Sequence, residues 1–143
     1  MVSTPRRLFL TVLGTSGVVG GCSSQAPTDT FADVNAGNIG DLPVNTLRPV
    51  GNLPVAIGRD ANGVYALTLT CTHQGCNIAV NGEVSIAAIY CTCHGSLFSP
   101  DGAVLGGPAT ASLRNFAVQL GADGALTIHT ADVVPAGSRT LTT

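Results

Sequence analysis

Two short segments bring cysteine and histidine together at spacings that suit metal binding. The first runs Cys71-Thr72-His73-Gln74-Gly75-Cys76, and the second runs Cys91-Thr92-Cys93-His94-Gly95-Ser96. Between His73 and Cys91 lie 17 residues. Two sulfur and two nitrogen donors from two loops can close one site. This ligand set suits zinc, or an iron–sulfur cluster that has histidine on one iron.

A structural zinc module is the simpler alternative for these segments. Zinc fingers space their cysteines by two to four residues and place both histidines on a helix. Here each segment instead contains one Cys-then-His pair and one additional cysteine. In an exported protein the two additional cysteines can form a disulfide. A scaffold with two disulfides is a further alternative, but it leaves both histidines without a role.

The pattern Cys-x-His, 17 residues, Cys-x-x-His resembles that of the Rieske iron–sulfur proteins. The resemblance covers roughly residues 50–130 and is greatest to the disulfide-bearing type of cytochrome bc complexes and arsenite oxidase small subunits. It implies one [2Fe-2S] cluster per chain, with Cys71 and Cys91 on one iron and His73 and His94 on the other.

The same resemblance implies roles for the residues around the cluster. Cys76 and Cys93 would form a disulfide over it, and the loop that contains Pro108 would lie beside it. Ser96 stands where the family's serine donates a hydrogen bond to a cluster sulfur.

Two residues depart from what the resemblance leads one to expect. Phe98 stands where many members of high potential have tyrosine, so we expect a potential below the top of the family's range. Gln74 stands where quinol-oxidising members have an apolar residue, which argues against quinol docking.

Mixed ligation has a defined effect on redox chemistry. Imidazole is neutral where thiolate is anionic, so two histidines make their iron easier to reduce. Rieske centres accordingly span about −150 to +300 mV, against about −400 mV for plant-type ferredoxins. Reduction adds negative charge, which favours protonation of exposed rings and couples electron to proton uptake.

Short strands separated by turns must position these segments. The Asn-Gly pairs at Asn62-Gly63 and Asn81-Gly82 predict hairpin turns, and each metal-binding segment follows an expected strand. The fold class is therefore all-β, an antiparallel β sandwich. The resemblance adds a small cluster-binding subdomain formed by two loops. The expected strands are Val55–Ile57, Val64–Leu69, Ile78–Val80, Val84–Tyr90, Ala103–Leu105, Leu113–Leu120 and Leu126–His129.

The N-terminus has the pattern of an export signal over residues 1–21. Arg6 and Arg7 precede a short apolar stretch, as in twin-arginine signals, and Val19-Gly20-Gly21-Cys22 resembles a bacterial lipobox. The chain has five cysteines, and four of them lie in the two segments. Cys22 is the one that remains. We therefore expect lipidation at Cys22. An ordinary signal peptide and an uncleaved anchor are the alternatives.

Composition and length bound the remaining possibilities. The chain has 143 residues, a formal net charge of −2 and no lysine, which excludes a nucleic-acid partner. We expect a polar linker over residues 22–41, the Rieske domain over 42–130 and a C-terminal tail over 131–143. His129 matches neither segment, so the chain lacks the histidines for a further non-haem iron site.

These features predict one-electron transfer on the periplasmic side of a bacterial envelope, with a lipid anchor to the membrane. The domain would act as a free carrier or as the iron–sulfur subunit of a larger oxidoreductase. Its donor and acceptor would be redox proteins or quinol, and it would have no catalytic site beyond the cluster. A quinol-oxidising subunit of a cytochrome bc-type complex is the alternative, and a molybdenum oxidase of the arsenite-oxidising kind is another possible assembly.

Overall fold

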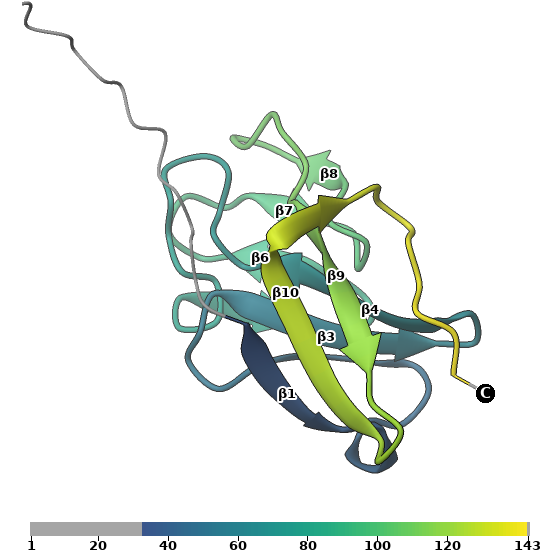
Figure 1. Cartoon of the computed structure of the whole chain (residues 1–143). Helices are drawn as coiled ribbons and strands as arrows, with labels where there is room; N and C mark the ends of the chain where they lie inside the picture. Colours follow the sequence, from purple (N-terminus) through teal and green to yellow (C-terminus); the bar gives the residue numbers. More distant parts are fainter. Residues whose placement is uncertain (1–32, 143) are drawn as a thin grey trace, which may run out of the picture.

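Two antiparallel sheets make up residues 33–142, the part of the chain that this computed structural model describes (Figure 1). Six strands form the larger sheet, in the order β1-β10-β9-β4-β3-β2. They are β1 (Val34–Asn38), β2 (Thr46–Pro49), β3 (Val55–Asp60), β4 (Gly63–Thr68), β9 (Asn115–Leu120) and β10 (Ala125–Val134). One short 3-10 helix, η1 (Ile39–Asp41), follows β1. The predicted all-β antiparallel fold is confirmed.

The smaller sheet is inserted between β4 and β9 and carries the Cys-His segments. Its four strands lie in the order β5-β6-β7-β8. They are β5 (Gly82–Val84), β6 (Ile89–Cys91), β7 (Leu97–Phe98) and β8 (Val104–Gly106). We call residues 69–113 the cluster-binding subdomain and the six-stranded sheet the base.

The hairpin of β3 and β4 forms at the predicted Asn-Gly turn. Asp60 pairs with Gly63, and Asp60 Oδ1 accepts a hydrogen bond from the N–H of Asn62 at 2.8 Å. Gly63 has a φ of 135°, which side chains of L-residues rarely permit. The turn residues therefore determine the register of β3 against β4.

Strand β4 lies between two hydrophobic cores, and all six of its residues are buried. Val64 and Ala66 face one core and Tyr65 and Leu67 face the other, as the alternation of a strand requires. In Figure 1, β1, β10 and β9 cross in front of β3 and β4, so the larger sheet curls over the first core. This core contains Val34, Leu42, Val55, Ile57, Phe116 and Ile128.

The second core joins the base to the cluster-binding subdomain. Leu67 from β4 packs there with Ile78, Ile89, Phe98 and Leu113. The chain then leads directly from this core into Cys71, which belongs to the same buried set. Hydrophobic packing thus fixes the place where the first metal-binding segment begins.

Two predicted strands of the subdomain are wrong in detail. Residues 78–80 form a turn, although Ile78 is buried. The strand expected over Val84–Tyr90 is split into β5 and β6. Ser85 closes a turn there, because its N–H donates to the carbonyl of Ala88 and its Oγ accepts from the same residue's N–H.

The structure also differs from the sequence prediction at both ends of the base. The expected linker over 22–41 contains β1, where Val34 pairs with Ile128 of β10. The expected tail over 131–143 contains the end of β10, and Thr140 bridges to Val64. A register shift after His129 interrupts the alternation of β10, so the sequence pattern stops before the strand does.

Within residues 33–142, no helix is long and apolar enough to cross a bilayer. The predicted signal over residues 1–21 and the predicted lipidation site Cys22 lie outside the described residues.

Candidate metal centre

The two Cys-His segments fold into loops with the same hydrogen bonds. In the first loop (residues 71–76), the N–H of Cys71 donates to the carbonyl of Cys76, and that of Gly75 to the carbonyl of Cys71, both at 2.8 Å. The second loop (residues 91–96) repeats these bonds at the equivalent positions, at 2.9 and 3.0 Å. The glycine at the fifth position has a φ of 77° in one loop and 87° in the other. The two loops therefore present corresponding side chains in a similar way.

A disulfide joins the two loops and leaves two thiols. Cys76 and Cys93 are bonded, as the resemblance implies, with their Cα atoms 6.7 Å apart. The Sγ atoms of both lie within 4.8 Å of the Cys91 Sγ. Because bonded sulfurs are not available as thiolate ligands, Cys71 and Cys91 remain as the thiol donors among the described cysteines. Both are buried, at 2% and 0% exposure.

The two histidine rings of the loops lie against each other. The centroids of His73 and His94 are 4.8 Å apart, and their planes cross at 74°. Nδ1 of His73 is buried and makes no hydrogen bond to any residue that the structure describes. A buried polar nitrogen without a partner costs roughly 1–3 kcal/mol. Coordination of a metal ion would satisfy this nitrogen.

The surroundings of Cys91 favour a metal over a free thiolate. Burial raises the pKa of this thiol, and the neighbouring Cys71 raises it further. The backbone N–H groups of Cys93 and His94 point at the sulfur and act in the opposite direction. A thiolate here therefore has hydrogen-bond donors ready, but it needs a cation to compensate for burial.

The donor set fits a [2Fe-2S] cluster with mixed ligands. Two buried thiols and two adjacent imidazoles come from two loops of similar shape. The structure thus brings Cys71, His73, Cys91 and His94 to one end of the subdomain. Their assignment as ligands remains a prediction.

A third loop lies beside the first two. Ser96 is fully buried, and its Oγ accepts a hydrogen bond from the N–H of Ala109 at 3.0 Å. Since this bond uses the oxygen as acceptor, the hydroxyl proton remains available to donate. The neighbouring Pro108 is exposed.

Threonines that the sequence prediction did not single out hold the loops in place. The Oγ1 of Thr72 donates to the carbonyl of Ala111 at 2.6 Å, and that of Thr92 to the carbonyl of Asn81 at 2.9 Å. Each threonine directly follows the first cysteine of its loop. The repeated Cys-Thr pair is therefore the signal that would have found them.

Phe98 and Gln74, two further predicted residues, lie in different environments. Phe98 is fully buried in the same core as Cys91. Gln74 is exposed at the edge of a groove of about 550 Å³ that opens beside His73. The groove is lined by Thr68, Thr70, Cys71, Thr72, His73, Gln74, Gly75 and Arg114.

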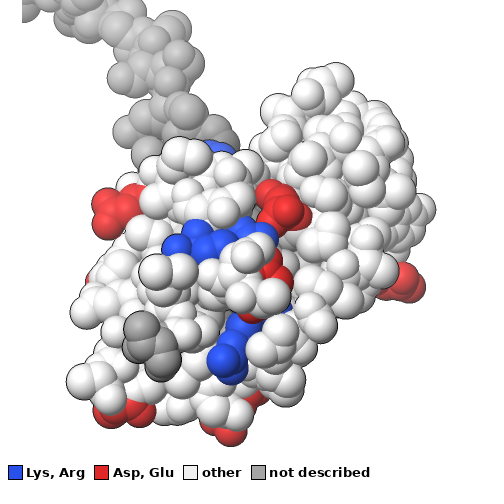
Figure 2. Space-filling view, turned by 90° about the vertical axis from the view of Figure 1, so that its right-hand side faces the viewer, with Lys and Arg blue, Asp and Glu red and all other residues white. Residues whose placement is uncertain are grey.

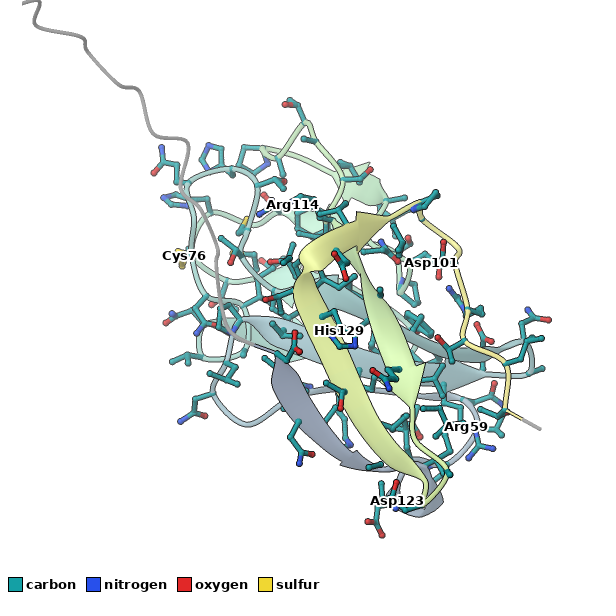
Figure 3. The ribbon with its side chains drawn as sticks, in the orientation of Figure 1. Arg59, Cys76, Asp101, Arg114, Asp123 and His129 are labelled. Atoms are coloured by element: carbon teal, nitrogen blue, oxygen red, sulfur yellow. A yellow bond between two sulfur atoms is a disulfide. The ribbon has the colours of Figure 1, made fainter. Side chains whose placement is uncertain are left out.

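His129 lies on the base, away from both loops (Figure 3). Its Nδ1 is 2.9 Å from Asp33 Oδ1, and its Nε2 is 3.0 Å from Gln119 Oε1. Both ring nitrogens therefore have partners on the base itself. In Figure 3 His129 lies near the middle of the molecule, with Cys76 to its left and Arg114 above it.

Charged side chains are concentrated on the base. Figure 2 shows Arg, Asp and Glu gathered on one part of the molecule, beside a lobe that is almost entirely uncharged. Between residues 69 and 113 the charged residues are Glu83 and Asp101. The metal-binding loops thus lie in a weakly charged part of the protein.

Comparisons with known proteins agree with this geometry. A family model described as "Rieske [2Fe-2S] domain" matches residues 33–117. The cytochrome b6-f complex iron-sulfur subunit of Prochlorococcus marinus is 42% identical over 64 residues, which is 43% of this chain and 35% of that subunit. The carotenoid phi-ring synthase of Chlorobaculum tepidum is 36% identical over 67 residues, covering 47% of this chain and 10% of the synthase.

A solved structure is similar over most of the chain. It belongs to a complex of reduced oxygenase and oxidised ferredoxin in carbazole 1,9a-dioxygenase. The TM-score is 0.50 at 26% identity, and the match covers 77% of this chain and 97% of the other. The chain therefore spans a small part of the two curated relatives but nearly all of this structural neighbour.

Proposed function

The chain belongs to the Rieske [2Fe-2S] domain family, and from this premise we propose that it transfers single electrons between redox partners. Rieske domains bind a [2Fe-2S] cluster. In this proposal Cys71 and Cys91 hold one iron, and His73 and His94 hold the other. The observation that carries the assignment is the pairing of two buried free thiols with two imidazoles whose centroids are 4.8 Å apart.

When bound, the cluster supplies one-electron redox chemistry at a potential raised by histidine ligation. The chain's own residues set the surroundings. The disulfide ties the loops together, and the buried Ser96 has a hydroxyl proton available to donate. His94 is exposed, so a partner can approach within a short distance of its ring.

The proposed partners are redox proteins, with the domain as a free carrier or as a subunit of a larger oxidoreductase. Similar domains occur in a complex subunit, in a synthase and in an oxygenase–ferredoxin complex, so the domain alone does not fix the assembly. The exposed amide of Gln74 beside His73 supports a protein partner over quinol. Three threonines and Arg114 add polar groups to the otherwise largely apolar lining of this groove.

For the location we propose the periplasmic face of a bacterial envelope, with Cys22 lipidated after removal of residues 1–21. This proposal rests on the sequence pattern Val19-Gly20-Gly21-Cys22. Mass spectrometry of the mature N-terminus tests it, since an unmodified Cys22 would contradict lipidation.

Metal analysis with EPR of the purified protein tests the central proposal. We expect equal amounts of iron and acid-labile sulfide, and a reduced signal with hyperfine coupling to two histidine nitrogens. His94→Cys should remove one of these couplings, while the matched change His129→Cys should keep both. Zinc without iron or sulfide would establish the structural module instead.

A further inference from the structure

The chain after β10 returns across the base as a strap, residues 135–142. Val64 and Thr140 exchange two backbone hydrogen bonds, at 2.9 and 2.8 Å, and Thr140 Oγ1 donates to the carbonyl of Val118 at 2.6 Å. A Cβ on Gly63 would lie 2.3 Å from the carbonyl oxygen of Thr140. The close approach of the strap thus depends on glycine at this position.

Arg139 of the strap is held by three groups. Its Nε donates to Asp60 Oδ2 at 2.7 Å, and its Nη2 donates to Asp101 Oδ1 at 2.5 Å. Its guanidinium carbon lies 3.8 Å from the centroid of the Tyr65 ring, in a cation–π contact. The side chains of Arg139 and Asp60 are 11% and 23% exposed, whereas that of Asp101 is 49% exposed, so solvent screens the Asp60 pair less than the Asp101 pair.

The two carboxylates belong to different parts of the molecule. Asp60 ends β3 in the base, whereas Asp101, which is labelled in Figure 3, lies in the turn between β7 and β8 of the cluster-binding subdomain. Burial raises the pKa of Asp60, but Arg139 and backbone hydrogen bonds from Asn62 and Gly63 together hold this pKa below its usual range. The same bridge keeps the pKa of Arg139 raised, although burial alone would lower it.

The hairpin of β7 and β8 connects this bridge to the metal-binding loops. At its turn, Asn115 Nδ2 donates to the carbonyl of Asp101, and the N–H of Gly102 donates to the carbonyl of Ser99. At its opposite end, β7 begins directly after Ser96, and β8 leads into the loop that contains Ala109. Ser96 and Ala109 are joined there by their buried hydrogen bond.

We propose that Arg139 is a positioning residue, which holds the β7–β8 hairpin on the base and so keeps Ser96 and the third loop aligned with the metal centre. The effect on the metal centre rests on the proposed function. The attachment of the hairpin to the base through Arg139, which we call the clamp, does not. Because the arginine is in the strap and its partners are in two other segments, the bridge forms only when all three are folded together.

Amide hydrogen exchange tests the clamp and needs no cluster. We expect Asp101→Asn and Arg139→Gln each to speed exchange of the Gly102 and Ala109 amides by about tenfold. Asp60→Asn should leave both amides near the wild-type rate, because Arg139 keeps Asp101 and Tyr65. Asp101→Glu should restore protection. Unchanged exchange in Asp101→Asn would overturn the proposal, whatever metal the chain holds.

The midpoint potential of the cluster-loaded protein separates positioning from simple charge. Removal of a carboxylate raises a potential through space, whereas removal of a guanidinium lowers it. Positioning instead predicts that Asp101→Asn and Arg139→Gln both lower the potential, and that the double variant lowers it no further than either. A rise in Asp101→Asn, with a fall in Arg139→Gln, would overturn the positioning of the metal centre.

Discussion

Cys76 and Cys93 form a disulfide that closes one loop over the other, across 17 positions of the sequence. Each of these cysteines lies within three positions of a histidine of the proposed ligand set. The covalent bond therefore constrains the two imidazole-bearing loops directly, independently of any metal.

Removal of the disulfide is expected to destabilise the subdomain. For a closed loop of this size, the chain-entropy model gives about 3 kcal/mol. The double variant Cys76→Ala/Cys93→Ala should unfold at lower urea concentration, and its visible absorption should bleach faster in the presence of a chelator. Equal bleaching rates for the variant and the wild type would contradict a role for this bond in holding the metal centre.

Ser96→Ala should lower both stability and midpoint potential. The change leaves the buried N–H of Ala109 without its acceptor, at a cost of about 1–3 kcal/mol, and removes a hydroxyl donor from the site. Urea unfolding and protein-film voltammetry measure the two effects. Ser99→Ala is the matched control, because Ser99 Oγ accepts from the N–H of Ala103 at the opposite, exposed end of the hairpin. If the midpoint potential of Ser99→Ala moves as far as that of Ser96→Ala, the effect does not come from the Ser96 hydroxyl.

Phe98→Tyr should raise the potential by adding a hydroxyl donor in the core that also contains Cys91. Without the cluster, this buried hydroxyl is expected to destabilise the chain by about 1–3 kcal/mol. Voltammetry of the loaded protein and urea unfolding of the metal-free protein should therefore move in opposite directions. Phe98→Leu controls for the change in packing. An unchanged midpoint potential in Phe98→Tyr would contradict a role for the added hydroxyl as a hydrogen-bond donor.

The Asp60–Arg139 pair predicts a stability effect confined to acid. Burial raises the pKa of Asp60, but the bond and charge of Arg139, together with backbone hydrogen bonds from Asn62 and Gly63, lower it below 3.8. A carboxylate with a lowered folded pKa contributes stability that is present above its unfolded pKa, about 3.9, and lost as pH falls through the folded value. Asp60→Asn should therefore be less stable than wild type by a constant amount down to about pH 4, and by less below it.

Urea midpoints measured across that range check the pH effect, with wild type and Asp60→Asn compared at equal metal content. Asp60→Asn in the Arg139→Gln background is the control, since the arginine that lowers the pKa is then absent. If the stability difference between wild type and Asp60→Asn stays constant to the lowest pH, ionisation of Asp60 does not contribute to stability in the way proposed.

Local spacing in the sequence predicted most of the candidate metal centre. The two Cys-His segments and the Asn-Gly turn at Gly63 are visible in a few neighbouring residues, and the Cys76–Cys93 pairing is what the resemblance to the Rieske family implies. Ligand chemistry and turn geometry depend on residue type at short spacing, so they need no knowledge of the rest of the chain. The same reasoning predicted the all-β class correctly.

Tertiary structure alone decided which segments meet. The strand at Val34–Asn38 forms because β10 is available to pair with it, and Ser85 interrupts an otherwise plausible long strand. Arg139 lies 79 positions from Asp60 and 38 from Asp101, so no local pattern signals their bridge. Pairings across such separations depend on the loops closed between them and on the faces buried, which single-sequence patterns do not contain.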